Sequence, residues 1–178
     1  MEKNNERKKA ESAFKNAAFI GYLVKKLKQQ SKRQVGKTKI QKLVYLLTRE
    51  GIADFDYSMH YYGPYSTKVA EELSIAEKAE IIQSRQNGEN RGFFLSVDEE
   101  KEGKFEYLLK DDEMAGIDAI VDKFGRFDAK ELSIISTYHF LNASSDLTQE
   151  ELVIEIHKIK NYREQDIRRV LERAAILN

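Results

Sequence analysis

The chain has 178 residues, a formal net charge of zero and no cysteine. This length suits one domain that buries a core without disulfides, metals or an obligate partner. A hydrophobic share of 41% lies above the range of disordered chains. The lack of cysteine excludes disulfide scaffolds, cysteine-zinc sites, iron–sulfur clusters and thiol nucleophiles, and it fits a reducing compartment, so we expect a cytoplasmic protein.

Charge is distributed unevenly along the chain. Up to Arg49 there are fourteen lysines and arginines against three glutamates, a net charge of +11, so the remainder carries −11. This asymmetry indicates a basic surface for nucleic acid or an acidic partner, or else a solvated helix end that the fold neutralises. The longest apolar run, Ala17 to Val24, is too short to span a membrane.

The first part of the chain predicts two helices after a polar tail. Residues 1–10 are nearly all polar, and we expect a flexible tail there. Apolar residues then recur at spacings of three and four from Phe14 to Leu27, which is typical of an amphipathic helix. A second helix is predicted over 37–50, with Gly51 as its C-terminal stop. Its buried stripe consists of Ile40, Leu43, Val44 and Leu47.

The middle of the chain predicts a strand-like segment, a third helix and a hairpin. Residues 57–62 are rich in aromatics and end at Gly63-Pro64, and a proline in the first helical turn predicts a helix from there. Residues 81–85 and 93–97 have strand patterns around Asn87-Gly88, a hairpin signal. Helices followed by a hairpin are typical of winged-helix domains.

The second half predicts about four helices with clear starts. Asp128 with Glu131 and Thr148 with Glu151 have the spacing of capping boxes. Asn161 with Glu164 predicts the cap of a final helix. We therefore expect a mainly α fold with minor β, in which a winged-helix-like core with a short β-hairpin is followed by a C-terminal helical bundle. The expected organisation is a flexible tail over 1–10 and one domain over 11–178, with a winged-helix-like part at 11–100 and a helical part at 111–178.

Several catalytic and cofactor signatures do not fit the chain. Gly36-Lys37-Thr38 resembles the end of a phosphate-binding loop, but Ser31 stands where the motif needs glycine and a polar stretch precedes it. The histidines, His60, His139 and His157, are too far apart in sequence to place two metal ligands on one helix face. We predict no enzyme activity, no metal and no cofactor, although thirty carboxylates leave a catalytic pair open.

Two short segments are the most distinctive in the chain. Residues 39–47 read KIQKLVYLL and residues 61–66 read YYGPYS. Core packing and a chain reversal would account for both segments. Alternatively, the tyrosines form an aromatic ridge that binds a partner, since tyrosine is enriched at binding centres.

With these two segments the chain resembles the Panacea (SocA-like) antitoxin family and related bacterial and archaeal proteins, in which a KLQKLxYL helix precedes a YGPxS turn and a further helix. The resemblance covers roughly residues 35–110. It implies a compact, winged-helix-like helical fold without enzyme activity. Some members of the family neutralise toxins or act as adaptors that deliver a partner to a protease. The basic region before residue 35 and the capped helices after residue 110 depart from the pattern. The matching positions are Lys39, Gln41, Lys42, Leu43, Tyr45, Leu46, Tyr62, Gly63, Pro64 and Ser66.

Two functions therefore compete. The first is a protein-interaction module, antitoxin-like or a proteolysis adaptor, whose partner is another protein such as a toxin or a protease substrate. Its candidate partner-binding residues are Tyr61, Tyr62, Pro64, Tyr65 and Ser66. The alternative is a winged-helix DNA-binding regulator. Its candidate nucleic-acid-binding residues are Lys37, Lys39, Lys42, Arg49, Arg85 and Arg91. Glu71, Glu72 and Glu77 on the predicted third helix would repel a phosphate backbone, which favours the protein-interaction module.

Overall fold

A computed structural model describes residues 2–31, 34–86, 93–98, 103 and 105–177, with side chains from Phe14 onward. The fold is mainly helical with minor β structure, as predicted, and the described strands form two two-stranded sheets. Its elements are α1 (Glu2–Gln30), α2 (Lys37–Arg49), β1 (Ser58–His60), β2 (Gly63–Tyr65), α3 (Thr67–Lys78), β3 (Ile82–Gln86), β4 (Phe93–Val97), the 3-10 helix η1 (Glu106–Leu108), α4 (Asp111–Phe124), α5 (Ala129–Ser144), α6 (Gln149–Lys160) and α7 (Glu164–Arg173).

Helix α2 lies at the centre of the molecule. Helices α1, α3, α4 and α5 all pack against it, and every residue from Lys39 to Leu47 is buried. Because α2 is buried on all sides, the apolar stripe predicted for this segment accounts for only part of its buried surface. The helix ends where predicted, because Gly51 adopts the left-handed conformation (φ 73°) that follows many helix ends.

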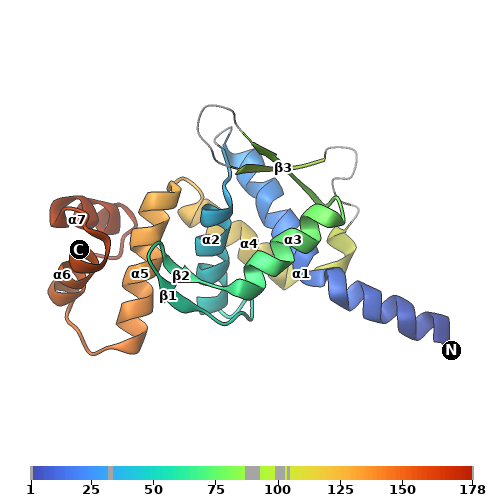
Figure 1. Ribbon diagram of the computed structural model, residues 1–178, viewed down its shortest axis with the longest axis horizontal. Coiled ribbons are helices and arrows are strands. Elements are labelled where there is room, and N and C mark those ends of the chain that lie inside the picture. Colours follow the sequence, from blue (N-terminus) through green and yellow to red (C-terminus); the bar gives the residue numbers. More distant parts are fainter. Residues whose placement is uncertain (1, 32–33, 87–92, 99–102, 104, 178) are drawn as a thin grey trace.

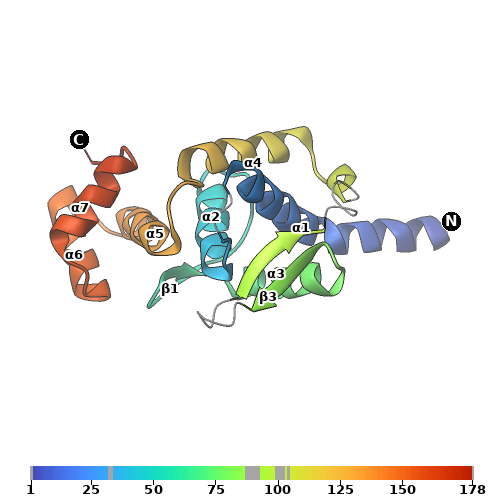
Figure 2. The same ribbon diagram turned by 90° about the horizontal axis from the view of Figure 1, so that it is seen from above.

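The two ends of the molecule are formed by different elements. Helices α6 and α7 pack on α5 at one end, while the start of α1 extends beyond the other elements at the opposite end (Figures 1 and 2). Helix α1 begins at Glu2, so it includes most of the stretch 1–10 that composition predicted as a tail. The division into a tail and one domain stays a prediction.

The predicted hairpin over 81–97 is present as β3 and β4. The strands pair antiparallel with Ile82 opposite Val97 and Gln86 opposite Phe93. On its other side β4 meets the chain before α2, through a bridge between Gly36 and Phe94. Asn87-Gly88 and Arg91 lie outside the described residues.

The prediction for Pro64 was wrong. Pro64 lies in β2 opposite Met59, and the helix starts only at Thr67 with Ser66 as its N-cap. The Ser66 Oγ accepts a hydrogen bond from the Val69 N–H (3.3 Å), which satisfies one of the free donors of the first turn. The aromatic segment thus forms a second hairpin, β1–β2, where only an isolated strand was predicted.

The helix starts in the second half follow the predicted caps with one exception. The reciprocal hydrogen bonds of the capping box are present at Asp128 with Glu131 and at Thr148 with Glu151. Asn161 instead ends α6 in a left-handed conformation (φ 54°), which asparagine tolerates better than most residues. Because Arg163 precedes α7 as its cap residue, the cap predicted at Asn161 was wrong. In the described part of the chain no helix is long and apolar enough to cross a membrane.

Candidate protein-interaction site

The hairpin β1–β2 ends in a two-residue loop, Tyr61-Tyr62, between the paired residues His60 and Gly63. Gly63 has a φ of 93°, and a Cβ atom there would lie 2.7 Å from the Thr137 Oγ1 and 3.3 Å from the Ser133 carbonyl oxygen. Only glycine combines this backbone conformation with so close an approach to α5. The sequence therefore seats the loop directly on the first half of α5.

Side chains from three helices bind the backbone of this loop. The Lys160 ammonium at the end of α6 donates to the Tyr61 carbonyl (3.1 Å), and the Ser133 hydroxyl of α5 donates to the Tyr62 carbonyl (2.6 Å). The Lys42 ammonium of α2 donates to the Pro64 carbonyl (2.6 Å). Residues from distant parts of the sequence thus hold three carbonyls within four consecutive positions.

The chain after the loop is held by Gln41 of the same central helix. Its side-chain amide donates to the Ser66 carbonyl (2.8 Å) and accepts from the Ser66 N–H (3.1 Å). A side-chain amide paired in this way replaces the two hydrogen bonds that a neighbouring strand would supply. Both residues are buried, so water does not compete for these bonds.

Lys42 and Lys160 are the least expected members of this arrangement. They are 1% and 3% exposed, and neither lies within ion-pair distance of a carboxylate among the described residues. Burial disfavours the charged form and lowers the pKa of each ammonium to about 8, and the charge of Lys160 adds to the shift at Lys42. Carbonyl oxygens therefore stabilise both ammoniums in place of a counter-ion.

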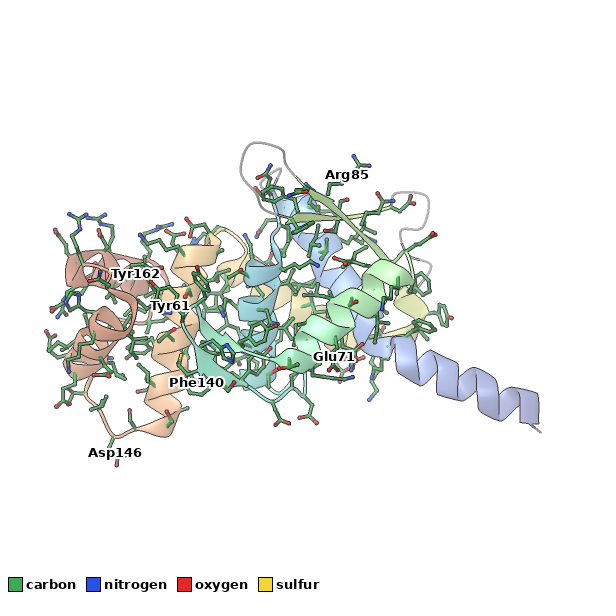
Figure 3. All side chains as sticks on the ribbon, in the orientation of Figure 1. Tyr61, Glu71, Arg85, Phe140, Asp146 and Tyr162 are labelled. Carbon is green, nitrogen blue, oxygen red and sulfur yellow. The ribbon has the colours of Figure 1, made fainter. Side chains whose placement is uncertain are left out.

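The tyrosine rings themselves point outward. Tyr61 is 66% and Tyr62 is 63% exposed, and their rings meet edge to face with centroids 5.0 Å apart. Tyr162, at the start of the segment before α7, lies near Tyr61 (Figure 3). Burial raises the pKa of Tyr162, and the hydroxyls of Tyr61 and Tyr62 add to this shift. Lys130 lies over the Tyr162 ring, 4.5 Å from its centroid. We call Tyr61, Tyr62 and Tyr162 the tyrosine surface.

A groove of about 250 Å³ runs beside the loop, between α2 and α3. Two lysines line it, but the Lys37 ammonium pairs with Glu77 (2.7 Å) and the Lys42 ammonium is bound by the Pro64 carbonyl. The groove borders the exposed ring of Tyr62. Its wall consists of Lys37, Thr38, Gln41, Lys42, Tyr62, Tyr65, Ala70 and Leu73.

The partner-binding candidates have different positions in the structure. Tyr61 and Tyr62 are exposed and Tyr65 is half-buried against the His60 ring, with centroids 4.9 Å apart. Pro64 and Ser66 are buried. The first three can touch a partner, whereas Pro64 and Ser66 shape the loop.

Sequence reasoning missed Ser133 and Lys160 entirely. A signal for Lys160 was available, because it continues the spacing of the buried positions Leu152, Val153 and Ile156 along α6. That spacing places the lysine on the inner face of the helix. Nothing in the sequence around Ser133 distinguishes it from a core serine.

The nucleic-acid candidates that the structure describes, which exclude Arg91, do not form one surface. The structure places Lys39 and Lys42 in the interior, where Lys39 donates to the Gly125 carbonyl (2.6 Å) and Lys42 to the Pro64 carbonyl, so neither ammonium is presented to a phosphate. Lys37 pairs with Glu77 (2.7 Å) at one end of α2 and Arg49 is exposed at the other, roughly 18 Å away at 1.5 Å per residue. Arg85 is exposed on the β3–β4 hairpin (Figure 3).

One acidic residue of α3 is buried and another is exposed. Glu72 is 3% exposed and pairs with Lys68 (3.1 Å), and its other contact is a hydrogen bond from Asn16 of α1 (3.4 Å). Glu72 therefore joins α1 to α3 and does not face outward as predicted. Glu71 remains on the surface of the helix.

The described residues contain no group of three or more histidine, aspartate or glutamate side chains that could hold a metal ion. The three histidines lie in separate places. His60 packs on Tyr65, and a ring nitrogen of His157 lies 2.7 Å from the Tyr162 carbonyl. Burial lowers the pKa of His139 to about 4, and the charges of Arg49 and Lys123 contribute. None of these contacts pairs a histidine with a nucleophile.

Comparison with known proteins agrees with the sequence motifs. No curated protein matches the chain. A family described as "Antitoxin SocA-like, Panacea domain" matches residues 40–140, which is more than half of the 178 residues and extends past the limit of 110 that the motifs suggested. The match includes α2 from Ile40 onward, the tyrosine loop and Ser133, while Lys160 lies beyond it. The chain therefore belongs to the SocA-like Panacea antitoxin family.

Proposed function

We propose that this protein is a non-enzymatic, antitoxin-like interaction module that binds a partner protein through Tyr61 and Tyr62, in the cytoplasm. The observation that carries the proposal is the contrast between the loop backbone and its side chains. Three helices hold the backbone with hydrogen bonds, while both rings project into solvent. A loop that is already ordered loses little entropy when a partner binds.

The chemistry of the surroundings indicates what such a partner would present. Tyrosine rings supply large amphipathic contacts with few rotatable bonds. The adjoining groove is lined in part by Ala70, Leu73 and the ring of Tyr65. A segment that presents apolar or aromatic side chains would complement both features.

In this proposal α2, α3 and the β3–β4 hairpin form a winged-helix-like scaffold. Nucleic-acid binding is less well supported, because Lys39 and Lys42 are buried and Lys37 and Arg49 lie at opposite ends of α2. A toxin is the class of partner that the family description suggests, and a protease substrate is the alternative for a proteolysis adaptor.

The test is capture of partners from host lysate, after nuclease treatment, by the wild-type chain and by a Tyr61→Ala/Tyr62→Ala variant. We expect the wild type to retain one protein in stoichiometric amount and the variant to bind it at least about tenfold more weakly, since buried aromatic anchors each contribute more than about 1 kcal/mol. Tyr107→Ala is the matched control, because Tyr107 is 67% exposed on η1, outside the tyrosine surface.

Equal capture by a folded double variant would remove the tyrosine surface from the proposal. Capture of nucleic acid alone, or loss of all bound material on nuclease treatment, would contradict protein binding and favour the DNA-binding function. Circular dichroism spectra that match those of the wild type establish that the variant is folded.

A further inference from the structure

Among the described residues, no strand pairs with the outer edge of β3, and backbone groups there point away from its sheet. The Leu95 N–H donates to the Val35 carbonyl (2.8 Å), on the side of β4 that faces away from β3. In an antiparallel pair the N–H and C=O of one residue point to the same side, and this side alternates along the strand. Ser84 lies opposite Leu95, so its N–H and C=O point outward. By the same alternation, the backbone N–H and C=O groups of Ile82 and Gln86 also point outward.

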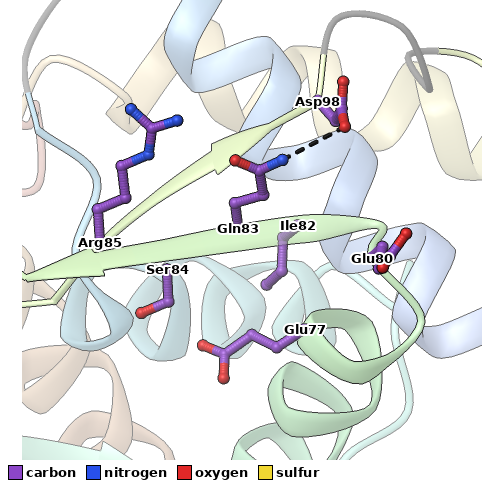
Figure 4. Close-up of a pocket in the computed structure, with 7 residues that line it drawn as sticks. All are labelled: Glu77, Glu80, Ile82, Gln83, Ser84, Arg85 and Asp98. Atoms are coloured by element: carbon purple, nitrogen blue, oxygen red, sulfur yellow. Dashed lines mark hydrogen bonds between the residues drawn. The ribbon is translucent and has the colours of Figure 1, made fainter.

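Open space lies along this edge. A cavity of about 580 Å³ is lined by residues from both faces of β3 and from the end of α3. In Figure 4, Ile82, Ser84 and Glu77 lie on one side of the strand, and Gln83 and Arg85 on the other. The Ser84 Oγ is buried and has no hydrogen-bond partner among the described residues.

We propose that β3 pairs antiparallel with β3 of a second copy of the chain, across a twofold axis at Ser84, to form a four-stranded sheet. In this register Ser84 lies opposite Ser84 of the second copy, and Ile82 lies opposite Gln86 of the second copy. Every outward-pointing residue then meets another outward-pointing residue, which allows about six backbone hydrogen bonds. A shift of the register by one residue would place outward-pointing residues opposite inward-pointing ones, and these hydrogen bonds would be lost.

The side chains are also self-complementary in this register. The two Ser84 side chains lie opposite each other on one face. Rotation about the Cα–Cβ bond would bring each Oγ, which is buried and without a partner among the described residues, out to form a cross-strand hydrogen bond. On the other face, Arg85 stands opposite Gln83 of the second copy. Gln83 donates to Asp98 (3.3 Å; Figure 4), so the guanidinium of one copy approaches a carboxylate of the other. A strand from an unrelated protein would have no reason to match these positions.

Sedimentation equilibrium of the purified full chain over a range of concentrations tests the proposal. We expect the mass to rise with concentration from 20.7 kDa towards twice that value. Ser84→Pro removes the outward N–H and the hydroxyl, while the β3–β4 hydrogen bonds, which Gln83 and Arg85 make, do not involve the Ser84 N–H, so this variant should stay at the mass of one chain. Ser84→Thr keeps the N–H and the hydroxyl, and it should associate like the wild type. A wild-type mass that stays at 20.7 kDa at every concentration would overturn the proposal.

Hydrogen exchange gives a second result that does not depend on a proline variant being folded. Raising the wild-type concentration should slow exchange of the Ser84 and Gln86 amides by about tenfold or more. The Gln83 and Arg85 amides, which point towards β4, should be protected at all concentrations. A dimer in which the Ser84 amide exchanges at the same rate as in the dilute protein would show that another surface associates. Because Tyr61 and Tyr62 lie on the other hairpin, their alanine variant should associate normally, which separates this inference from the proposed function.

Discussion

Gly63 shows how one residue places the binding loop. The hairpin approaches α5 so closely that the Ser133 hydroxyl reaches the Tyr62 carbonyl, and only a residue without a Cβ atom permits this. Gly51 offers an internal comparison. It has a similar φ of 73°, but apart from its chain neighbours no atom of the described residues lies within 4 Å of the position that a Cβ atom would occupy.

Gly63→Ala should lower the free energy of unfolding by about 2–4 kcal/mol, because it adds a steric clash to the cost of a left-handed backbone. Gly51→Ala should cost only the backbone part, about 1–2 kcal/mol. Urea unfolding of the two variants measures the difference. Thr137→Ala should recover part of the loss in Gly63→Ala by removing the nearest atom. Equal costs for the two glycines would mean that α5 moves aside without penalty.

Three lysines have positions that the sequence did not predict. Lys39 and Lys42 were predicted on the surface and are buried, and Lys160, also buried, was assigned no role. Lysine has a long apolar stem, so it can lie inside a helix packing surface provided that its ammonium finds oxygen acceptors. The acceptors here are backbone carbonyls of Gly125, Pro64 and Tyr61, brought close by the tertiary fold. No spacing rule along one helix contains that information.

At the scale of elements, local signals predicted helices better than short strands. Capping boxes place their partners three residues apart, so Asp128 and Thr148 could be recognised directly. The strands β1 and β2 have three residues each and one contains Pro64, and their pairing is held by α2, α5 and α6. The tyrosines were recognisable as candidates, but their support was not.

Helix α5 links its own cap to the loop that it carries. The Asp128 carboxylate accepts from the Glu131 N–H (2.8 Å) and the Glu131 carboxylate accepts from the Asp128 N–H (2.9 Å), less than two turns before Ser133. The capping box therefore stabilises the same end of α5 that binds the Tyr62 carbonyl.

Asp128→Ala should lower the free energy of unfolding by about 1 kcal/mol, because it leaves a first-turn donor without its acceptor. Asp128→Asn should retain most of the stability, since asparagine caps helices equally well. Thermal or urea unfolding of both variants checks this. If Asn and Ala proved equally damaging, the contribution of Asp128 would be its charge and not its hydrogen bond.

At the scale of the whole molecule, burying two ammoniums makes stability depend on pH. The pKa of Lys42 and of Lys160 is about 8 in the folded protein and about 10.4 in an unfolded chain. Between these values the unfolded state binds more protons, so the free energy of unfolding rises with pH across this window. Below it, both states are protonated and the cost of the buried charges is fully present.

From about pH 7 to about pH 9 we expect the free energy of unfolding to increase by about 1 kcal/mol for each of the two lysines. Lys42→Met keeps the apolar stem and should remove about half of this increase. Urea unfolding at a series of pH values gives the slope directly. A wild-type slope that Lys42→Met leaves unchanged would assign the pH dependence to other groups.

The hydrogen bond from Lys160 to the Tyr61 carbonyl couples the C-terminal helices to the tyrosine loop, 99 residues earlier in the chain. Coupling of this kind is reciprocal in free energy. A partner that fastens the tyrosine loop must also suppress opening of α6, and anything that loosens α6 must weaken the partner's hold by the same factor. The C-terminal helices do not include Tyr61 or Tyr62. A change in these helices can nevertheless release a bound partner.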